Sequence, residues 1–215
     1  MRACPSPNFG PRRGGVAPHL IVLHYTAMPS AADARARLCD PVAEVSAHYL
    51  IDLDGTLWSL VPEEARAWHA GAGAWAGCAD VNSASIGIEL QNRGDHPYPL
   101  PQIAALCALV GDLRARHAIA PQGVIGHADL APTRKADPGP RFDWRALARA
   151  GPAVWAAPAA LAGLPQPEHR VDDAQDEGRP HAEQQQGQRD LHQRHAAVAP
   201  HSTTSSRRRT RLPAR

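Results

Sequence analysis

The chain has 215 residues, and its 23 basic and 21 acidic residues leave a net charge of +2. This length suits one catalytic domain with an additional segment, and a charge near zero provides no global field that would attract nucleic acid. The longest near-unbroken apolar run, residues 20–23, is far shorter than the roughly 20 residues of a membrane helix, so the sequence predicts no membrane span.

The first half of the chain alternates short apolar runs with polar turns. The expected elements, in chain order, are a strand at 20–24, a short helix at 31–38, and two strands at 46–53 and 56–61. Asp54-Gly55 stands between the last two runs and predicts a hairpin with a two-residue turn of positive φ.

The second half adds two strands and two helices. They are a strand at 85–90 with Ile86 and Ile88 on one face, an amphipathic helix at 101–117, a strand at 124–127, and a helix at 143–150 with Asp143 as its N-cap. Strands and helices mix without strict alternation. This order favours an α/β fold with a central mixed β-sheet flanked by α-helices.

Residues 166–215 differ in composition, because they contain no aromatic residue and few large apolar ones. Such a segment cannot bury enough apolar surface to offset its ordering entropy. We therefore expect a folded domain at 1–165, with its core at about 18–155, followed by a disordered tail. The arginine cluster at 207–211 could contact lipid or nucleic acid or be a solvated end, and a frameshifted terminus would look the same.

The beginning of the chain has no apolar stretch typical of a secretory signal, which favours a cytoplasmic location over the periplasmic or extracellular alternative. The cysteines, Cys4, Cys39, Cys78 and Cys107, form no Cys-x-x-Cys pair. A disulfide framework is not expected in a cytosolic chain of this size. Each cysteine is interpreted as a small hydrophobic residue or a spectator.

Two histidines, His24 and His127, directly follow apolar runs, and Asp137 comes ten residues after the second. Two imidazoles and one carboxylate are enough for a catalytic zinc site with an open fourth position. The chain lacks the His-Glu-x-x-His pattern that would fix ligand geometry on one helix. Spacing alone therefore leaves a structural role open for each histidine.

Glu89 and Lys135 are candidates for proton transfer and charge stabilisation. Glu89 lies within the strand at 85–90, where it either faces solvent or is buried; beside a zinc site it could act as general base and then acid. Lys135 is the single lysine among the 23 basic residues. It is either a chance survivor or marks a place where a compact charge near Asp137 stabilises an oxyanion.

His48 and His69 could orient a ligand or contact a substrate, and a structural hydrogen-bonding role is the alternative for both. The segment 68–77 contains two tryptophans and three glycines. This composition is typical of a surface loop that lines a groove.

Four regions together resemble the type 2 N-acetylmuramoyl-L-alanine amidases, the zinc branch related to T7-type phage lysozyme and to peptidoglycan recognition proteins. The matching regions are 21–26, 45–51, 66–71 with 82–89, and 126–140, the last being the most specific. The resemblance covers about 5–155, none of the tail, and is closest to the bacterial AmpD/AmiD-like branch.

The resemblance implies a mixed sheet flanked by helices, with one zinc per chain in a surface groove. It implies cleavage of the amide between N-acetylmuramic acid, or its anhydro form, and L-alanine of the stem peptide. By position the metal ligands are His24, His127 and Asp137. Glu89 corresponds to the catalytic acid/base and Lys135 to the oxyanion stabiliser.

The same resemblance predicts substrate contacts from Trp68, His69 and Asn82. One departure is Ala47, which stands where phage-type relatives have a tyrosine, so Glu89 must carry the proton transfers. The expected partners are peptidoglycan fragments or murein, with no nucleic acid, and a monomer is favoured. A non-catalytic peptidoglycan-binding module of the same fold is the alternative, whereas a nucleic-acid binder would need a stacking platform or a basic groove that the core lacks.

Overall fold

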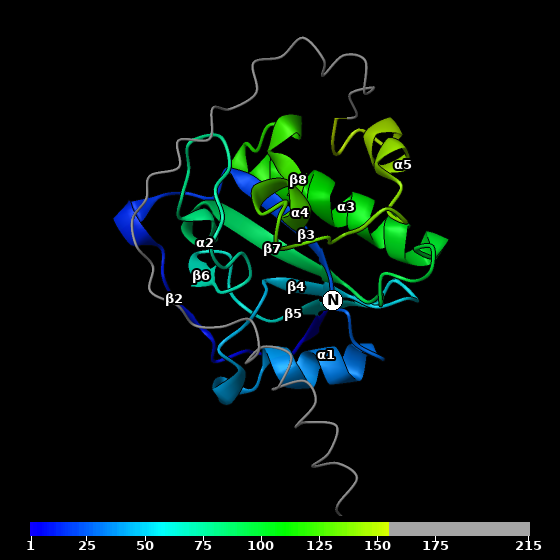
Figure 1. Ribbon diagram of the computed structural model, residues 1–215, viewed down its shortest axis with the longest axis horizontal. Helices are drawn as coiled ribbons and strands as arrows, with labels where there is room; N and C mark the ends of the chain where they lie inside the picture. The colour runs from blue at the N-terminus through cyan, green and yellow to red at the C-terminus, as the bar shows by residue number, and fades with distance from the viewer. Residues whose placement is uncertain (155–215) are drawn as a thin grey trace, which may run out of the picture. The chain divides into compact units, whose positions relative to one another are not determined.

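The computed structural model describes residues 1–154, so the predicted tail at 166–215 lies outside the described residues. The strands of the main sheet are β1 (Arg2–Ala3), β3 (Leu20–Tyr25), β4 (Tyr49–Ile51), β5 (Leu57–Ser59), β7 (Ser85–Leu90) and β8 (Val124–Gly126). Their order is β1-β5-β4-β7-β3-β8, and only the β4–β5 pair is antiparallel. The predicted mixed sheet is therefore confirmed (Figure 1).

A separate two-stranded sheet joins β2 (Phe9–Pro11) to β6 (Ala65–Ala67). The helices are α1 (Ala31–Leu38), α2 (Val81–Ala84), α3 (Leu100–His117), α4 (His127–Leu130) and α5 (Trp144–Arg149), with short 3-10 turns at Arg13–Gly15, Pro41–Ala43 and Pro121–Gly123. In Figure 1, α1 lies on one side of the main sheet and α3 on the other. Within residues 1–154, no helix combines the length and apolar character that crossing a bilayer requires.

Capping side chains fix two of the helix starts that the sequence predicts. The Ser30 side chain accepts a hydrogen bond from the Asp33 backbone N–H at the start of α1. The Asp143 side chain accepts one from the Ala146 N–H at the start of α5. Each bond satisfies a backbone donor that the first helical turn leaves unpaired, which is why these residue types begin helices.

The hairpin at β4 and β5 forms as predicted, but its turn is longer than the sequence indicated. The Asp52 N–H donates to the Thr56 carbonyl at 2.9 Å, so three residues, 53–55, form the loop. Among the three loop residues, positive φ occurs only at Gly55, where it is 84°. The expected two-residue turn is wrong, because a three-residue loop needs a single left-handed residue at its end and glycine supplies it.

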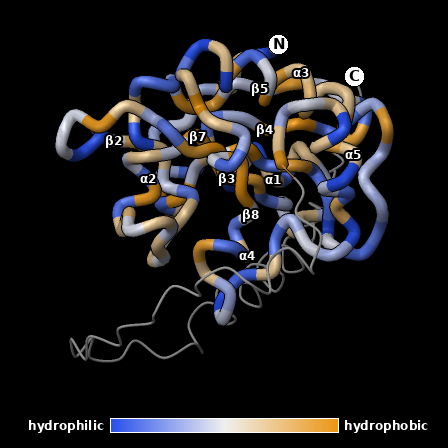
Figure 2. The backbone as a smooth tube through the Cα atoms, turned by 90° about the horizontal axis from the view of Figure 1, so that it is seen from above, coloured by the Kyte–Doolittle hydropathy of each residue, from blue (hydrophilic) through white to orange (hydrophobic). Residues whose placement is uncertain are grey.

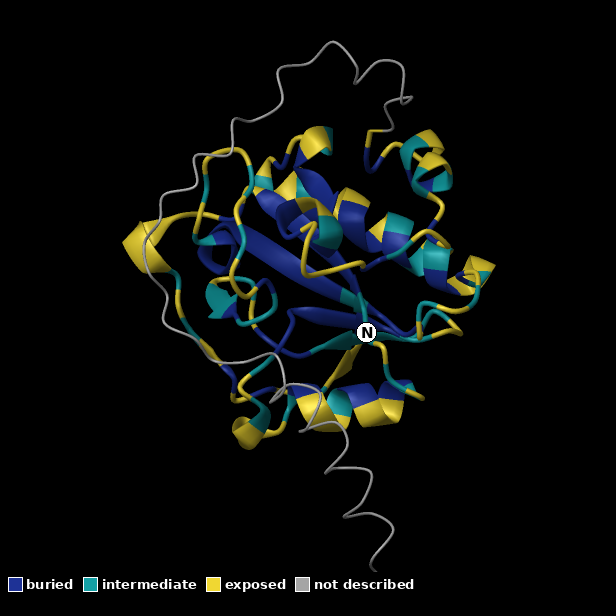
Figure 3. Ribbon diagram, in the orientation of Figure 1, coloured by how far each residue is buried: buried dark blue, intermediate teal, exposed yellow. Residues whose placement is uncertain are grey.

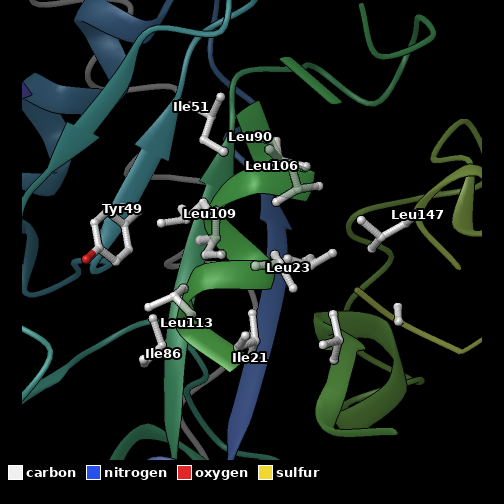
Figure 4. Packing of buried hydrophobic residues seen from close by; sticks show 14 of the residues in the cluster. Ile21, Leu23, Tyr49, Ile51, Ile86, Leu90, Leu106, Leu109, Leu113 and Leu147 are labelled. Atoms are coloured by element: carbon white, nitrogen blue, oxygen red, sulfur yellow. The ribbon is translucent and has the colours of Figure 1, made fainter. Parts of the chain in front are cut away.

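Alternation along β3 and β7 sends one set of apolar side chains toward α3. This set comprises Ile21 and Leu23 of β3 and Ile86, Ile88 and Leu90 of β7, which pack with Leu106, Leu109 and Leu113 of α3 (Figure 4). The predicted shared face of Ile86 and Ile88 is confirmed. Full burial of each such side chain contributes about 1.5–3 kcal/mol, so this layer anchors the sheet.

The opposite face of the sheet carries the intervening residues. Leu20 and Val22 of β3 pack with residues of α2, and Leu50 of β4 packs with residues of α1. Figure 2 shows the hydrophobic residues concentrated in central strands such as β3 and β7, and Figure 3 shows the same strands buried. Since side chains alternate between faces, His24 and Glu89 lie on this second face, near the carboxyl ends of β3 and β7.

Candidate metal and catalytic site

Parallel pairing brings residues that are distant in the sequence to one end of the sheet. The register of β3 against β7 sets His24 opposite Glu89, and the register of β3 against β8 sets Leu23 opposite Gly126. His127 follows Gly126 directly and begins α4. Carboxyl ends of parallel strands are common places for ligand sites, because neighbouring strands end there together.

Asp137 reaches the same place through a loop that folds back on α4. The backbone N–H of Ala128 donates to the Asp137 carbonyl at 2.9 Å, and the N–H of Lys135 donates to the Ala131 carbonyl at 2.9 Å. These bonds hold the chain next to His127. Pro132 lies within this loop and Pro138 directly follows Asp137, so the fixed φ of proline restrains the chain in addition to these bonds.

The three predicted ligands converge with one donor atom each. His24 Nδ1 lies 2.9 Å from His127 Nδ1 and 2.9 Å from Asp137 Oδ2, and His127 Nδ1 lies 3.0 Å from the same carboxylate oxygen. All three residues are buried, and they form a group that can hold one metal ion. Two imidazole nitrogens and a carboxylate oxygen are the donor types of catalytic zinc sites.

Second contacts set the orientation of both imidazoles. His127 Nε2 lies 3.0 Å from the Ala70 carbonyl oxygen, which can only accept. Nε2 therefore carries the proton, and Nδ1 keeps its lone pair for a metal. The Arg134 guanidinium also donates to the carbonyls of Ala70 and Ala72, which holds this segment next to His127.

For His24 the outer partner is another histidine. His24 Nε2 lies 3.0 Å from His69 Nδ1, and His69 Nε2 lies 3.2 Å from Ser85 Oγ. Ser85 Oγ in turn donates to the Val81 carbonyl. When His24 offers Nδ1 to a metal, its Nε2–H donates to His69 Nδ1, and His69 Nε2–H donates to the serine oxygen. Each hydrogen bond in this series, from His24 to the Val81 carbonyl of α2, thus pairs one donor with one acceptor.

His69 reaches this position because β7 has a glycine beneath it. A Cβ atom at Gly87 would lie 2.5 Å from the His69 ring. A glycine inside a strand often marks such a close approach, and this signal was present in the sequence but was not used. Gly87 and Ser85 are supporting residues that sequence reasoning missed.

The three predicted substrate-contacting residues occupy different surroundings. Asn82 is buried, and its side-chain oxygen accepts from the N–H groups of His69 and Ala70 at 2.9 and 2.8 Å. Trp68 is half-buried, and its backbone N–H donates to Ser46 Oγ. Asn82 therefore holds the segment that carries His69.

His48 is fully buried and has partners on both ring nitrogens. Its Nδ1 accepts from the Gly87 N–H at 2.9 Å, and its Nε2 lies 3.2 Å from the Ala65 carbonyl. Burial lowers the His48 pKa to about 3, so the ring is neutral. These contacts favour the structural alternative for this histidine.

The electrostatics of the ligands suit metal binding. Burial lowers the pKa of His24, which keeps its imidazole neutral. Burial alone would raise the pKa of Asp137, but hydrogen bonds with His127 and His24 outweigh it and lower that pKa. Neutral imidazoles and an ionised carboxylate are the ligand forms that a metal requires.

Glu89 is a carboxylate whose pKa is raised by its surroundings. Its Oε2 atom is buried and has no hydrogen-bond partner among residues 1–154. Burial, followed by the charge of Asp137, raises the Glu89 pKa to about 8, and the Lys135 charge opposes this rise. Lys135 itself is exposed, and its charge also lowers the pKa of His24, so it lies within electrostatic reach of the site.

Comparison with protein families and curated proteins agrees with this geometry. The Amidase_2 family, described as N-acetylmuramoyl-L-alanine amidase, matches residues 14–140. The chain is 43% identical over 152 residues to N-acetylmuramoyl-L-alanine amidase AmiD of Escherichia coli K12, covering 63% of this chain and 54% of AmiD. It is 36% identical over 160 residues to 1,6-anhydro-N-acetylmuramyl-L-alanine amidase AmpD of Citrobacter freundii, covering 66% and 86%.

Solved structures show the same fold. A selenomethionine derivative of AmpD superposes with a TM-score of 0.66 at 34% identity, covering 70% of this chain and 93% of that one. Escherichia coli AmiD, in complex with anhydro-N-acetylmuramic acid-L-Ala-D-gamma-Glu-L-Lys, superposes with a TM-score of 0.63 at 39% identity, covering 72% and 66%. The chain belongs to the Amidase_2 family of N-acetylmuramoyl-L-alanine amidases, although it spans only about half the length of AmiD.

Proposed function

We propose that this protein is a zinc-dependent amidase that hydrolyses the bond between N-acetylmuramic acid and the L-alanine of a stem peptide. The observation that carries the proposal is the β3–β7 register, which sets the unpartnered Glu89 carboxylate beside His24 of the buried metal-binding group. A hydrolytic amidase needs these two parts, a metal position and a proton carrier, next to each other.

His24, His127 and Asp137 would hold the zinc ion, and the fourth position would remain open to solvent and substrate. When bound, zinc acts as a Lewis acid that lowers the pKa of water toward about 7 and polarises a carbonyl oxygen. The two outer contacts, from the Ala70 carbonyl and from His69, fix the rings of the two histidines. Such contacts raise the basicity of the ligands and hold them in place.

Glu89 would take a proton from a water molecule, and the oxygen of this water would attack the amide carbonyl carbon. The Lys135 ammonium would stabilise the negative charge that develops on the carbonyl oxygen. Glu89 would then give its proton to the alanine nitrogen, and the carbon–nitrogen bond would break. The positive charge of a metal ion bound by the three ligands would lower the raised pKa of Glu89 toward the range in which a carboxylate can act as a base.

We further propose that the substrate is a soluble anhydromuramyl peptide. The AmiD structure contains an anhydromuramyl peptide, and the AmpD relatives are named 1,6-anhydro-N-acetylmuramyl-L-alanine amidases. Trp68 is retained as a substrate contact, whereas the hydrogen bonds of His69 and Asn82 favour a supporting role for these two residues.

The test is product analysis by mass spectrometry. The full chain is incubated with anhydro-N-acetylmuramic acid-L-Ala-D-gamma-Glu-L-Lys and, separately, with intact murein. The proposal expects release of a peptide with a free alanine amine from the first substrate, loss of this release with a metal chelator, and its return when zinc is added. Intact metal loading without any cleavage of either substrate would instead support the non-catalytic binding module.

A further inference from the structure

Two cysteines from distant parts of the chain meet on the α1 side of the sheet. Cys4 Sγ and Cys39 Sγ lie 3.4 Å apart, although the two residues are 35 positions apart in the sequence. Cys4 directly follows β1, and Cys39 is the residue after the last one of α1. Both pack with the apolar cluster that includes Leu38 and Leu50. The other two cysteines pack in different clusters.

The backbone holds both cysteines in place. The Cys4 N–H donates to the Ser59 carbonyl at 2.9 Å, and the Cys39 N–H donates to the Arg35 carbonyl at 2.9 Å. A disulfide has a sulfur–sulfur bond of about 2.05 Å, so the two atoms need to approach by only about 1.4 Å. Rotation about the Cα–Cβ bonds moves both sulfurs, and this is the motion we expect to close the gap.

We propose that Cys4 and Cys39 are a disulfide-forming pair that covalently ties β1 to the end of α1. The oxidant is a low-molecular-weight disulfide such as oxidised glutathione. This inference differs from the expectation that every cysteine is a spectator, because only the tertiary structure brings these two together. It stands apart from the amidase activity, since neither sulfur belongs to the metal group.

The reaction balances as two thiol–disulfide exchanges. The Cys4 thiol loses its proton, its sulfur attacks the oxidant, and one small thiol leaves, which gives a mixed disulfide on Cys4. The Cys39 sulfur, after losing its proton, then attacks the Cys4 sulfur, and the second small thiol leaves. The pair loses two electrons, the oxidant gains them, and both protons end on the two released thiols. Burial and the neighbouring Cys4 raise the Cys39 pKa to about 12, so the Cys39 thiol is a slow first nucleophile at neutral pH.

The bond would act on a short strand at the edge of the sheet. β1 has only two residues and pairs only with β5, at the edge. Short terminal strands open more easily than central ones. A crosslink that closes a loop of this length restricts the unfolded chain, so oxidation should raise the Tm by about 5–10 °C.

The experiment uses the full chain with Cys78→Ser and Cys107→Ser, which leaves only the proposed pair. The protein is equilibrated in reduced and oxidised glutathione, alkylated with N-ethylmaleimide and weighed. We expect loss of two hydrogens, no alkylation, the rise in Tm, and reversal of all three by dithiothreitol. Two free thiols, or glutathione on each cysteine without an internal bond, would overturn the proposal.

Two controls make the result specific. Adding Cys39→Ser should leave Cys4 able only to carry glutathione, with no rise in Tm. The converse chain, with Cys4→Ser and Cys39→Ser, should form no internal disulfide between Cys78 and Cys107.

If the first background is unstable, the unaltered chain gives the same answer by tryptic mapping. Trypsin separates residues 3–12 from residues 38–66, so a linked pair of these peptides identifies the bond. Recovery of only the unlinked peptides after oxidation would overturn the proposal.

Discussion

His24 and His69 are joined through their ring nitrogens, with His24 Nε2 3.0 Å from His69 Nδ1. This contact directs the other nitrogen of His24, Nδ1, toward Asp137 and His127. The rings cross at 79°, so His69 supports His24 at its edge. The orientation of His24, a candidate metal ligand, thus depends on His69, which was predicted from the sequence to contact the substrate.

We therefore expect His69→Ala to weaken zinc binding by about 10–100-fold, because an outer partner of a ligand contributes that much to metal affinity. The dissociation constant is measured by competition with a chromophoric chelator, which requires no enzyme activity. The exposed His19 serves as control, and His19→Ala should leave the constant unchanged. Equal affinity in the His69 variant, with its fold intact, would remove His69 from the metal site.

Gly87 offers a second way to displace His69 without removing it. In Gly87→Ala the new methyl group would lie 2.5 Å from the His69 ring, so the ring must move. We expect a loss of about 1–3 kcal/mol in the free energy of unfolding and weaker zinc binding. Gly111→Ala in α3 is the matched control, because nothing lies within 4 Å of its Cβ and alanine favours a helix. Urea denaturation of both variants checks the contrast; a Gly87 variant as stable as the Gly111 variant would contradict it.

Glu89→Gln should abolish most of the activity while preserving the fold and the metal. General acid–base groups contribute about 10²–10⁴-fold to turnover, and glutamine cannot carry the proton. Because an unpartnered buried carboxylate is costly, the metal-free variant should be at least as stable as the parent. Steady-state kinetics on a muramoyl peptide, beside a zinc assay and a thermal melt, test all three statements. Near-normal turnover would mean that another residue moves the proton.

Lys135→Arg tests whether the single lysine is required as a lysine. A guanidinium is wider and spreads its donors, so it cannot occupy the place of a compact ammonium. Loss of one oxyanion donor costs about 10²–10³ in kcat, and KM should change little because the contact forms mainly in the transition state. Arg141→Lys, at an exposed position nearby in the chain, is the control for exchange of the two residue types. A kcat equal to that of the parent in Lys135→Arg would show that a lysine is not required at this position.

Glu63, which is not one of the candidate metal ligands, allows a test of how the stability of the fold depends on pH. Burial would raise its pKa, but hydrogen bonds from Arg116, Tyr49 and His117 outweigh burial and lower it to about 2. Because the folded pKa lies below the unfolded one, Glu63 stabilises the fold above about pH 4.5, and this contribution is lost as the pH falls toward 2.

Glu63→Gln should therefore lower the Tm at pH 6, and its difference from the parent should shrink as the pH falls from 4.5 toward 2. The exposed neighbour Glu64 gives the matched variant Glu64→Gln, for which we expect little change at any pH. Thermal melts across this pH range decide the matter. A difference that stays constant down to the lowest pH would show that the carboxylate charge of Glu63 is not what stabilises the fold.

The sequence by itself determined the elements whose signals are local. The apolar run that ends at His24, the strand that contains Glu89, and the N-cap Asp143 depend on periodicity and side-chain chemistry within a few residues. These signals placed His24 and His127 at the ends of strands, where the structure has them. The resemblance to a known family then assigned chemistry to residues that spacing alone left open.

Only the tertiary structure decided which distant residues touch. Strand order and register set His24 opposite Glu89; the periodicity within each strand indicates which face is buried but not which strand lies beside it. The packing of His69 over Gly87 and the contact between Cys4 and Cys39 likewise depend on segments that meet only after the sheet has formed. The loop that contains Gly55 shows that strand pairing also matters at short range. The number of residues in this loop is fixed by how β4 and β5 pair and not by the Asp-Gly sequence alone.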